Sequence, residues 1–176
     1  MKKAAQELSE RVHAHQPDKG GAPYALHPAR VAANVQTHPE FAQLSIDEQE
    51  SLICAGYLHD VVEDGPDYGF EYTPADLIDM GFSPTTAEIV ELLTKPRKNR
   101  SGPTDLDPYY RAIAAHPLAR LVKLCDIADN TNYARSARLP AELRNRLATK
   151  YVHALDMLSL SEAEHGWLEG LRQAQV

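Results

Sequence analysis

The sequence has few cysteines and no long apolar stretch, and each absence narrows the possible functions. Its 176 residues include two cysteines, Cys54 and Cys125, both in apolar stretches and without the spacing of a metal-binding motif. We therefore expect buried free thiols in a protein from a reducing compartment. No stretch is as long as a membrane span, and the Met-Lys-Lys start lacks the apolar run of a signal peptide. The expected location is the cytoplasm.

Positive charge is also scarce. The formal net charge is −7, and the chain has no long run of Lys and Arg. Binding to nucleic acid depends on clustered basic side chains that displace counterions, so neither nucleic acid nor a membrane is an expected partner. A small anionic molecule remains compatible with this charge if a metal ion or a local basic pocket reverses the field. The oligomeric state is left open.

The composition is that of an ordinary globular protein with helical periodicity. Hydrophobic residues make up 43% and charged residues 24% of the chain, which suits a single domain over residues 1–176. Apolar residues recur at helical spacing almost throughout, and no segment reads convincingly as a strand. The predicted fold class is therefore all-α. Helices are expected at 4–14, 25–37, 45–64, 74–80, 84–93, 107–115, 118–134, 140–159 and 161–173.

The helix expected at 45–64 is the most informative segment. Ser45 and Glu48 form a capping-box pattern at its start, and its middle is apolar on all sides, as in a buried central helix. It ends in the sequence His-Asp-Val-Val-Glu-Asp at residues 59–64. Four ionisable side chains beside a buried helix cost folding free energy unless they are paired or bind a metal.

On a continuous helix these four side chains would project into one sector, because residues four apart share a face. They would also lie at the negative end of the helix dipole, which favours a cation. Imidazole and carboxylate groups without a thiolate suit a divalent metal such as Mn²⁺, Fe²⁺ or Zn²⁺. The alternative is an exposed acidic helix end with a satisfied histidine.

Two other segments favour the metal site. His27 lies at an apolar helix start, in the run from Tyr24 to Val31. Asp126 lies inside an otherwise apolar helix, where an unpaired carboxylate would be rare, and Asp129 and Asn130 follow one turn later.

The order of His27, His59-Asp60 and Asp126 resembles the metal-binding pattern of the HD-domain superfamily of phosphohydrolases. The surrounding segments are similar to the hydrolase domain of the RelA/SpoT-type alarmone enzymes and to the small alarmone hydrolases. Four segments carry this similarity in the family's order, namely Ala14-His15-Gln16, Lys19 to Ala32, His59 to Asp64, and Lys123 to Asn130. The similarity spans most of the chain.

The resemblance implies an HD-domain helical bundle around a mononuclear metal site. It also implies a guanosine-3′,5′-bis(diphosphate) 3′-pyrophosphohydrolase, whose partner is a small phosphorylated nucleotide. Mn²⁺ is the expected metal, with Fe²⁺, Zn²⁺ or Mg²⁺ as alternatives. The implied site residues are His27, His59, Asp60 and Asp126 for the metal, Glu63 and Asp64 for catalysis, and Asn130 for the nucleotide. Lys19 and Lys123 are candidate contacts for the phosphates, although Lys123 could instead form a salt bridge with a neighbouring carboxylate.

Two departures from the family pattern concern the substrate. Asp18 stands where the family has an Arg that stacks on guanine, and Asp129 stands where it often has His. The basic loop at residues 95–100 is either a contact for phosphates or a solvated loop. No residues remain for a synthetase domain, so alarmone synthesis is not expected.

Two other functions stay open. One is an HD phosphohydrolase that acts on another nucleotide or phosphate ester. The other is a degenerate HD module that binds a nucleotide without catalysis, against which the intact Glu63-Asp64 pair argues.

Overall fold

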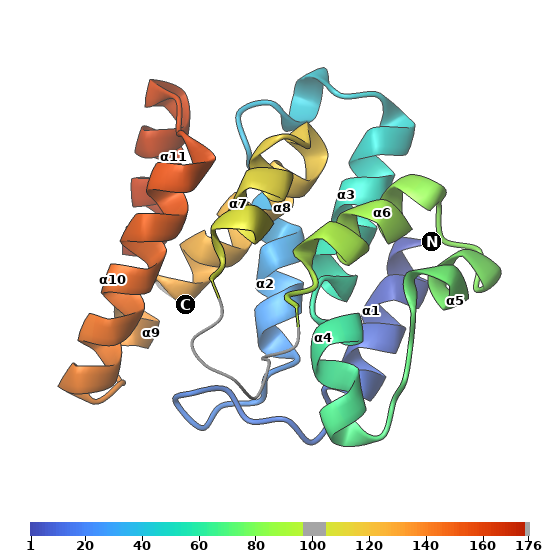
Figure 1. Cartoon of the computed structure of the whole chain (residues 1–176), viewed down its shortest axis with the longest axis horizontal. Helices are drawn as coiled ribbons and strands as arrows, with labels where there is room; N and C mark the ends of the chain where they lie inside the picture. The colour runs from blue at the N-terminus through green and yellow to red at the C-terminus, as the bar shows by residue number, and fades with distance from the viewer. Residues whose placement is uncertain (97–104, 175–176) are drawn as a thin grey trace.

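The computed structural model describes residues 1–96 and 105–174, and this part of the chain folds into packed helices (Figure 1). The α-helices are α1 (Lys2–Val12), α2 (Leu26–Val35), α3 (Ile46–Leu58), α4 (Val61–Asp64), α5 (Pro74–Asp79), α6 (Pro84–Leu93), α7 (Asp107–Ala114), α8 (Pro117–Asn130), α9 (Tyr133–Ser136), α10 (Ala141–Leu158) and α11 (Glu162–Gln173). Two 3₁₀ turns, η1 (Phe41–Gln43) and η2 (Gly65–Tyr68), complete the elements. Apart from one isolated bridge between Pro17 and Pro23, the described residues contain no β-structure, which confirms the all-α prediction. None of the described helices combines the length and the apolar character that crossing a bilayer requires.

Helix α3 lies at the centre of the arrangement and packs against α1, α2, α6 and α8. It begins at the predicted capping box, in which Ser45 Oγ accepts from the Glu48 amide and the Glu48 carboxylate accepts from the Ser45 amide. Figure 1 shows α10 and α11 at one end of the molecule, α1 and α5 at the other, and α2, α3 and α8 between them.

The close contact between α2 and α3 depends on a glycine. A Cβ atom at Gly56 would lie only 2.8 Å from the Cα atom of Ala32. Because Gly56 has no side chain, the two backbones approach closely, and the helix that starts beside His27 lies against the helix that ends before His59.

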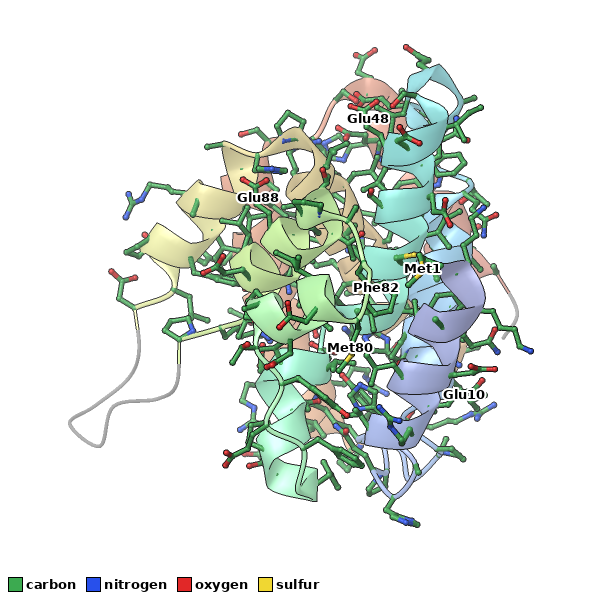
Figure 2. The ribbon with its side chains drawn as sticks, turned by 90° about the vertical axis from the view of Figure 1, so that its right-hand side faces the viewer. Met1, Glu10, Glu48, Met80, Phe82 and Glu88 are labelled. Carbon is green, nitrogen blue, oxygen red and sulfur yellow. The ribbon has the colours of Figure 1, made fainter. Side chains whose placement is uncertain are left out.

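The apolar core has two parts, one on each side of α3. The larger part joins residues of α2, α3, α6, α7, α8 and α10, and it contains Cys125. The smaller part joins α1, α3, α5 and α6, and it contains Cys54. Figure 2 shows this second side, where Phe82 packs against the α1 residues of the smaller part. Both cysteines are buried and free, as predicted.

The helix predicted at 45–64 is divided in two, so the prediction of one continuous helix is wrong. Helix α3 ends at Leu58, and the short α4 begins at Val61. The carbonyl of Gly56, which a continuing helix would pair with the Asp60 amide, instead bonds Nδ1 of His59 at 2.9 Å. Asp60 stays in the right-handed region but departs from ideal helical angles, with φ −105° and ψ −2°.

The helix predicted at 118–134 is divided as well. Helix α8 ends at Asn130, and α9 begins after Asn132, whose backbone is extended with φ −56° and ψ 131°. The side chain of Asn132 accepts a hydrogen bond from the Arg135 amide and caps α9. A capping side chain therefore starts a separate helix, α9.

Candidate metal centre

Three helices place four buried side chains around one point. His27 lies in the first turn of α2, His59 and Asp60 follow the end of α3, and Asp126 lies in α8. The nitrogen–oxygen distances are 3.2 Å for His27 Nε2–Asp126 Oδ1, 3.8 Å for His27 Nε2–Asp60 Oδ2, 3.0 Å for His59 Nε2–Asp60 Oδ2 and 3.9 Å for His59 Nε2–Asp126 Oδ1. The structure thus brings together all four residues in which the sequence predicts a metal site.

Each of the two histidines has one ring nitrogen without a hydrogen-bond partner among the described residues. Nε2 of His27 and Nε2 of His59 are buried and make no hydrogen bond within the described part of the chain. Their Nδ1 atoms are occupied, by Asp129 Oδ2 at 2.6 Å and by the Gly56 carbonyl at 2.9 Å. A buried nitrogen without a hydrogen bond requires an explanation, and two of them beside two carboxylates could hold a divalent metal. One ligand atom each from His27, His59 and Asp60 lies within 4.8 Å of the others.

The charges around these side chains favour a cation. Burial lowers the pKa of His27, but the carboxylates of Asp126 and Asp129 outweigh it and raise the pKa to about 9. Burial likewise lowers the pKa of His59, but the charge of Asp60, its hydrogen bond to His59 and the charge of Asp126 together outweigh burial, so the pKa is raised. Burial raises the pKa of Asp126, but Lys123 and the histidines hold it well below its usual value. The carboxylates stay ionised, and a field that attracts a proton to the imidazoles also attracts a metal ion.

Neutral and basic side chains hold the two carboxylates in place. The Tyr24 hydroxyl donates to Asp60 Oδ2. Lys123 Nζ donates to Asp126 Oδ2 at 2.7 Å, and Asn130 Nδ2 donates to Asp126 Oδ1. Lys123 thus makes the salt bridge that the sequence left as the alternative, and the amide of Asn130 is bound to Asp126 here.

Glu63 and Asp64 are each bound by a side chain from another segment. The Glu63 carboxylate accepts from Lys95 Nζ at 2.8 and 2.9 Å and from the Lys95 amide at 3.0 Å. Asp64 Oδ2 accepts from Gln16 Nε2 at 2.7 Å. The helix that was expected to carry all four side chains of residues 59–64 breaks at Asp60, and other segments hold the second pair.

Asp64 has an unusual environment for a carboxyl group. Burial and the charge of Asp60 raise the pKa of Asp64 to about 6, although the hydrogen bond from Gln16 opposes the increase. Gln16 is fixed in turn, because its Oε1 lies 2.7 Å from Nδ1 of buried His13. Gln16 and Tyr24 stand inside family-like motifs, but their residue types alone did not reveal these contacts.

Lysines from several segments add positive charge beside the cluster. Lys150 of α10 lies 5.0 Å from the ring centroid of Tyr151. Burial and the charges of Lys95 and Lys123 lower the pKa of Lys150 to about 8, and Lys19 acts in the same direction. Sequence reasoning singled out Lys19 and Lys123 and placed Lys95 in the basic loop, but it missed Lys150, because nothing in the pattern of α10 shows what the helix packs against.

Asp18, which stands where the family has an arginine, binds backbone amides of its own turn. Its Oδ1 accepts from the amides of Gly20 and Ala22, and its Oδ2 accepts from Arg135 Nη2 at 3.1 Å. Of the basic loop at residues 95–100, Lys95 and Pro96 are described, and the rest of this candidate phosphate contact lies outside the described residues.

No family model matches the chain. A protein of Aquifex aeolicus named guanosine-3′,5′-bis(diphosphate) 3′-pyrophosphohydrolase is 32% identical over 129 residues, which cover 72% of this chain and 16% of that protein. A Synechocystis protein named as a probable enzyme of the same activity is 38% identical over 87 residues, which cover 49% of this chain and 10% of that protein. A GTP pyrophosphokinase of Streptomyces coelicolor is 29% identical over 154 residues, which cover 85% of this chain and 16% of that protein. The chain thus spans a small part of the length of these relatives.

A solved structure has a similar fold along nearly the whole chain. It is of a metazoan orthologue of SpoT that is described as hydrolysing ppGpp and acting in starvation responses. The two structures align with a TM-score of 0.73 and 20% sequence identity, over 97% of this chain and 92% of the other. At this level of identity the likeness shows a common fold.

Proposed function

The chain belongs to the family of RelA/SpoT-type HD hydrolase domains, and from this premise we propose that it is a metal-dependent phosphohydrolase that removes pyrophosphate from the 3′ position of guanosine 3′,5′-bis(diphosphate). The observation that carries the proposal is the buried group of two imidazoles and two carboxylates, in which both Nε2 atoms have no other described partner. The two relatives named as 3′-pyrophosphohydrolases support the choice of substrate.

We assign His27, His59, Asp60 and Asp126 as the ligands of one divalent ion. Mn²⁺ is the proposed metal, and Fe²⁺, Zn²⁺ and Mg²⁺ are the alternatives that the same nitrogen and oxygen donors accept. When bound, such an ion polarises phosphoryl oxygens and makes water a better nucleophile at neutral pH. Tyr24, Lys123 and Asn130 hold the two carboxylates and so fix the positions of these two ligands.

The Glu63-Asp64 pair is proposed to position the attacking water and take its proton. A pKa of about 6 suits Asp64 for this task, because the group is ionised at neutral pH and still accepts a proton well. Burial is the largest cause of this raised pKa, and the charge of Asp60 is the second. Lys95 holds Glu63, and Gln16 holds Asp64, so neither carboxylate depends on the substrate for its orientation.

The lysines beside the cluster are proposed to receive the phosphates. Lys19, Lys95, Lys123 and Lys150 come from four separate segments, and their charges act together on one region although the whole chain has a net charge of −7. Asn130 stays a candidate contact for the nucleotide, in exchange for its bond to Asp126.

A second candidate function is an HD phosphohydrolase that acts on another nucleotide or phosphate ester. The observation that favours it is Asp18, whose carboxylate is bound to its own turn and to Arg135. A carboxylate at this place offers no stacking on a purine, whereas an arginine would add about 0.5–2 kcal/mol.

The test is the release of pyrophosphate by the Mn²⁺-loaded protein from guanosine 3′,5′-bis(diphosphate), its adenosine counterpart and simple 5′-nucleotides. We expect cleavage at the 3′ position with a weak preference for guanine. Glu63→Gln should keep the metal and lose on the order of 10²-fold in kcat if this residue handles the proton. Glu71→Gln, which removes the charge of an exposed glutamate outside the site, is the matched control and should keep its rate. Cleavage of 5′-nucleotides alone would replace the alarmone activity with the second candidate.

A further inference from the structure

Asp129 lies behind His27, on the side away from the proposed metal. Its Oδ2 is 2.6 Å from Nδ1 of His27, while Nε2 of the same ring is 3.2 Å from Asp126 Oδ1. Asp126 and Asp129 are one turn apart on α8. The carboxylate of Asp129 therefore lies beside Nδ1 of His27, and that of Asp126 lies beside Nε2 of the same ring. Both His27 and Asp129 are buried, at 1% and 4% exposure.

Two arginines fix the carboxylate of Asp129. Arg30 of α2 donates from Nε to Oδ1 at 2.6 Å and from Nη2 to Oδ2 at 3.3 Å. Arg135 of α9 donates from Nη1 to Oδ2 and to the Asp129 carbonyl, the latter at 3.0 Å. Its Nη2 reaches Asp18, which ties α9 to the turn before α2. The carboxylate is thus held from two helices, and its position is defined independently of His27.

This arrangement determines how His27 is protonated. A carboxylate between two guanidinium groups is ionised and can only accept hydrogen bonds, so Nδ1 of His27 must be the donor. A neutral imidazole with its proton on Nδ1 has its lone pair on Nε2, toward Asp126 and Asp60. The other histidine differs, because Nδ1 of His59 meets the uncharged carbonyl of Gly56.

We propose that Asp129, held by Arg30 and Arg135, is a positioning residue that keeps His27 in the tautomer and orientation in which Nε2 binds the metal. The inference rests on the metal site of the proposed function but is independent of the substrate. Removing the Asp129 carboxylate should therefore weaken metal binding before any effect on a particular nucleotide is considered.

The experiment measures the Kd of Mn²⁺ and Zn²⁺ for the full chain by calorimetric titration, in Asp129→Asn and Asp129→Ala. We expect Kd to rise about 10–100-fold, as is usual when the partner of a ligating histidine is removed. The larger rise is expected for Asp129→Ala, which leaves Nδ1 of His27 without an acceptor, whereas the amide oxygen of an asparagine can still accept its proton. The matched control is Asp107→Asn, which removes the carboxylate of an exposed pair, His153 Nε2–Asp107 Oδ1 at 2.8 Å, and should leave Kd unchanged. Melting temperatures of the metal-free proteins separate a loss of fold from a loss of affinity.

A second measurement needs no substitution. In the Zn²⁺-loaded wild-type protein, ¹⁵N-histidine NMR should show His27 with a slowly exchanging proton on Nδ1 and the metal on Nε2. The opposite tautomer would overturn the proposal, and so would folded Asp129 variants with the wild-type Kd. If the wild-type protein binds metal as expected but does not cleave the alarmone, the proposed function fails and this inference stands. If it binds no divalent metal, both fail.

Discussion

At the scale of single residues, the histidines show how surroundings decide a role. His13 and His38 also have buried Nε2 atoms without a hydrogen bond among the described residues. Burial lowers the pKa of both, whereas the neighbouring carboxylates raise the pKa of His27 and His59. An unpaired nitrogen is therefore weak evidence alone, and the adjacent pair of carboxylates is what distinguishes the proposed ligands.

The contact between Gln16 and Asp64 yields a prediction about pH. Activity that needs ionised Asp64 should rise with pH through about 6 and then level off, because the pKa of Asp64 is raised to about 6 from an ordinary value of 3.8. The hydrogen bond from Gln16 lowers this pKa, so Gln16→Leu should move the rising limb of kcat/KM to higher pH. Profiles of kcat/KM against pH for both proteins check this.

The control for this prediction is Gln6→Leu, because Gln6 also donates to a carboxylate, that of Glu10, on the exposed face of α1. Its profile should match that of the wild type. An unmoved limb in Gln16→Leu would mean that Asp64 is not the group whose ionisation limits the rate.

At the scale of the elements, periodicity predicted the helices but not where two of them break. Each predicted helix overlaps a helix of the structure, because an apolar stripe at helical spacing needs a buried face. The break at Asp60 depends on the side chain of His59 taking a backbone carbonyl, which no apolar pattern records. The break before α9 had a visible signal in Asn132, a good capping residue, but the apolar pattern outweighed it.

The site, like the helices, could be predicted in part from the sequence. The order of motifs predicted the four residues that the structure brings together, and their role as metal ligands stays a prediction. Lys95 and Lys150 could not be foreseen as neighbours of the site, because each reaches it from a segment far away in the sequence. Long-range packing decides such contacts, and a single sequence does not encode it in any local pattern.

The approach of α2 to α3 leads to a prediction about stability. Gly56→Ala would place a Cβ atom 2.8 Å from the Ala32 backbone, so the two helices would have to separate. Overpacking of this kind costs about 1–3 kcal/mol of the free energy of unfolding. Since the same helices position His27 and His59, the Kd of Mn²⁺ should also rise. Urea unfolding and metal titration measure the two effects.

Helix α11 offers the matched control for this substitution. Nothing lies within 4 Å of a Cβ atom built at Gly170, so Gly170→Ala should be neutral or stabilise the protein by up to about 1 kcal/mol through helix propensity. A Gly56→Ala protein as stable as Gly170→Ala would contradict the close packing of α2 on α3.

At the scale of the whole molecule, the fold brings together acidic and basic side chains that lie far apart in the sequence. The net charge of −7 predicts little about the site, where lysines and arginines from separate helices surround a few buried carboxylates. Helices α2, α3 and α8, central in Figure 1, carry or adjoin all four proposed ligands. The single domain over residues 1–176 stays a prediction. The region matched in the Aquifex protein covers only 16% of that relative.

The central claim is that one divalent ion binds between α2, α3 and α8, and anomalous diffraction from crystals of the Mn²⁺-loaded protein tests it most directly. The account predicts one strong manganese peak per chain, with His27 Nε2, His59 Nε2 and oxygens of Asp60 and Asp126 at about 2.0–2.3 Å. Crystals of Asp126→Ala grown with the same metal should lack this peak. A manganese ion that binds elsewhere, or no peak in the wild-type protein under saturating metal, would contradict the account.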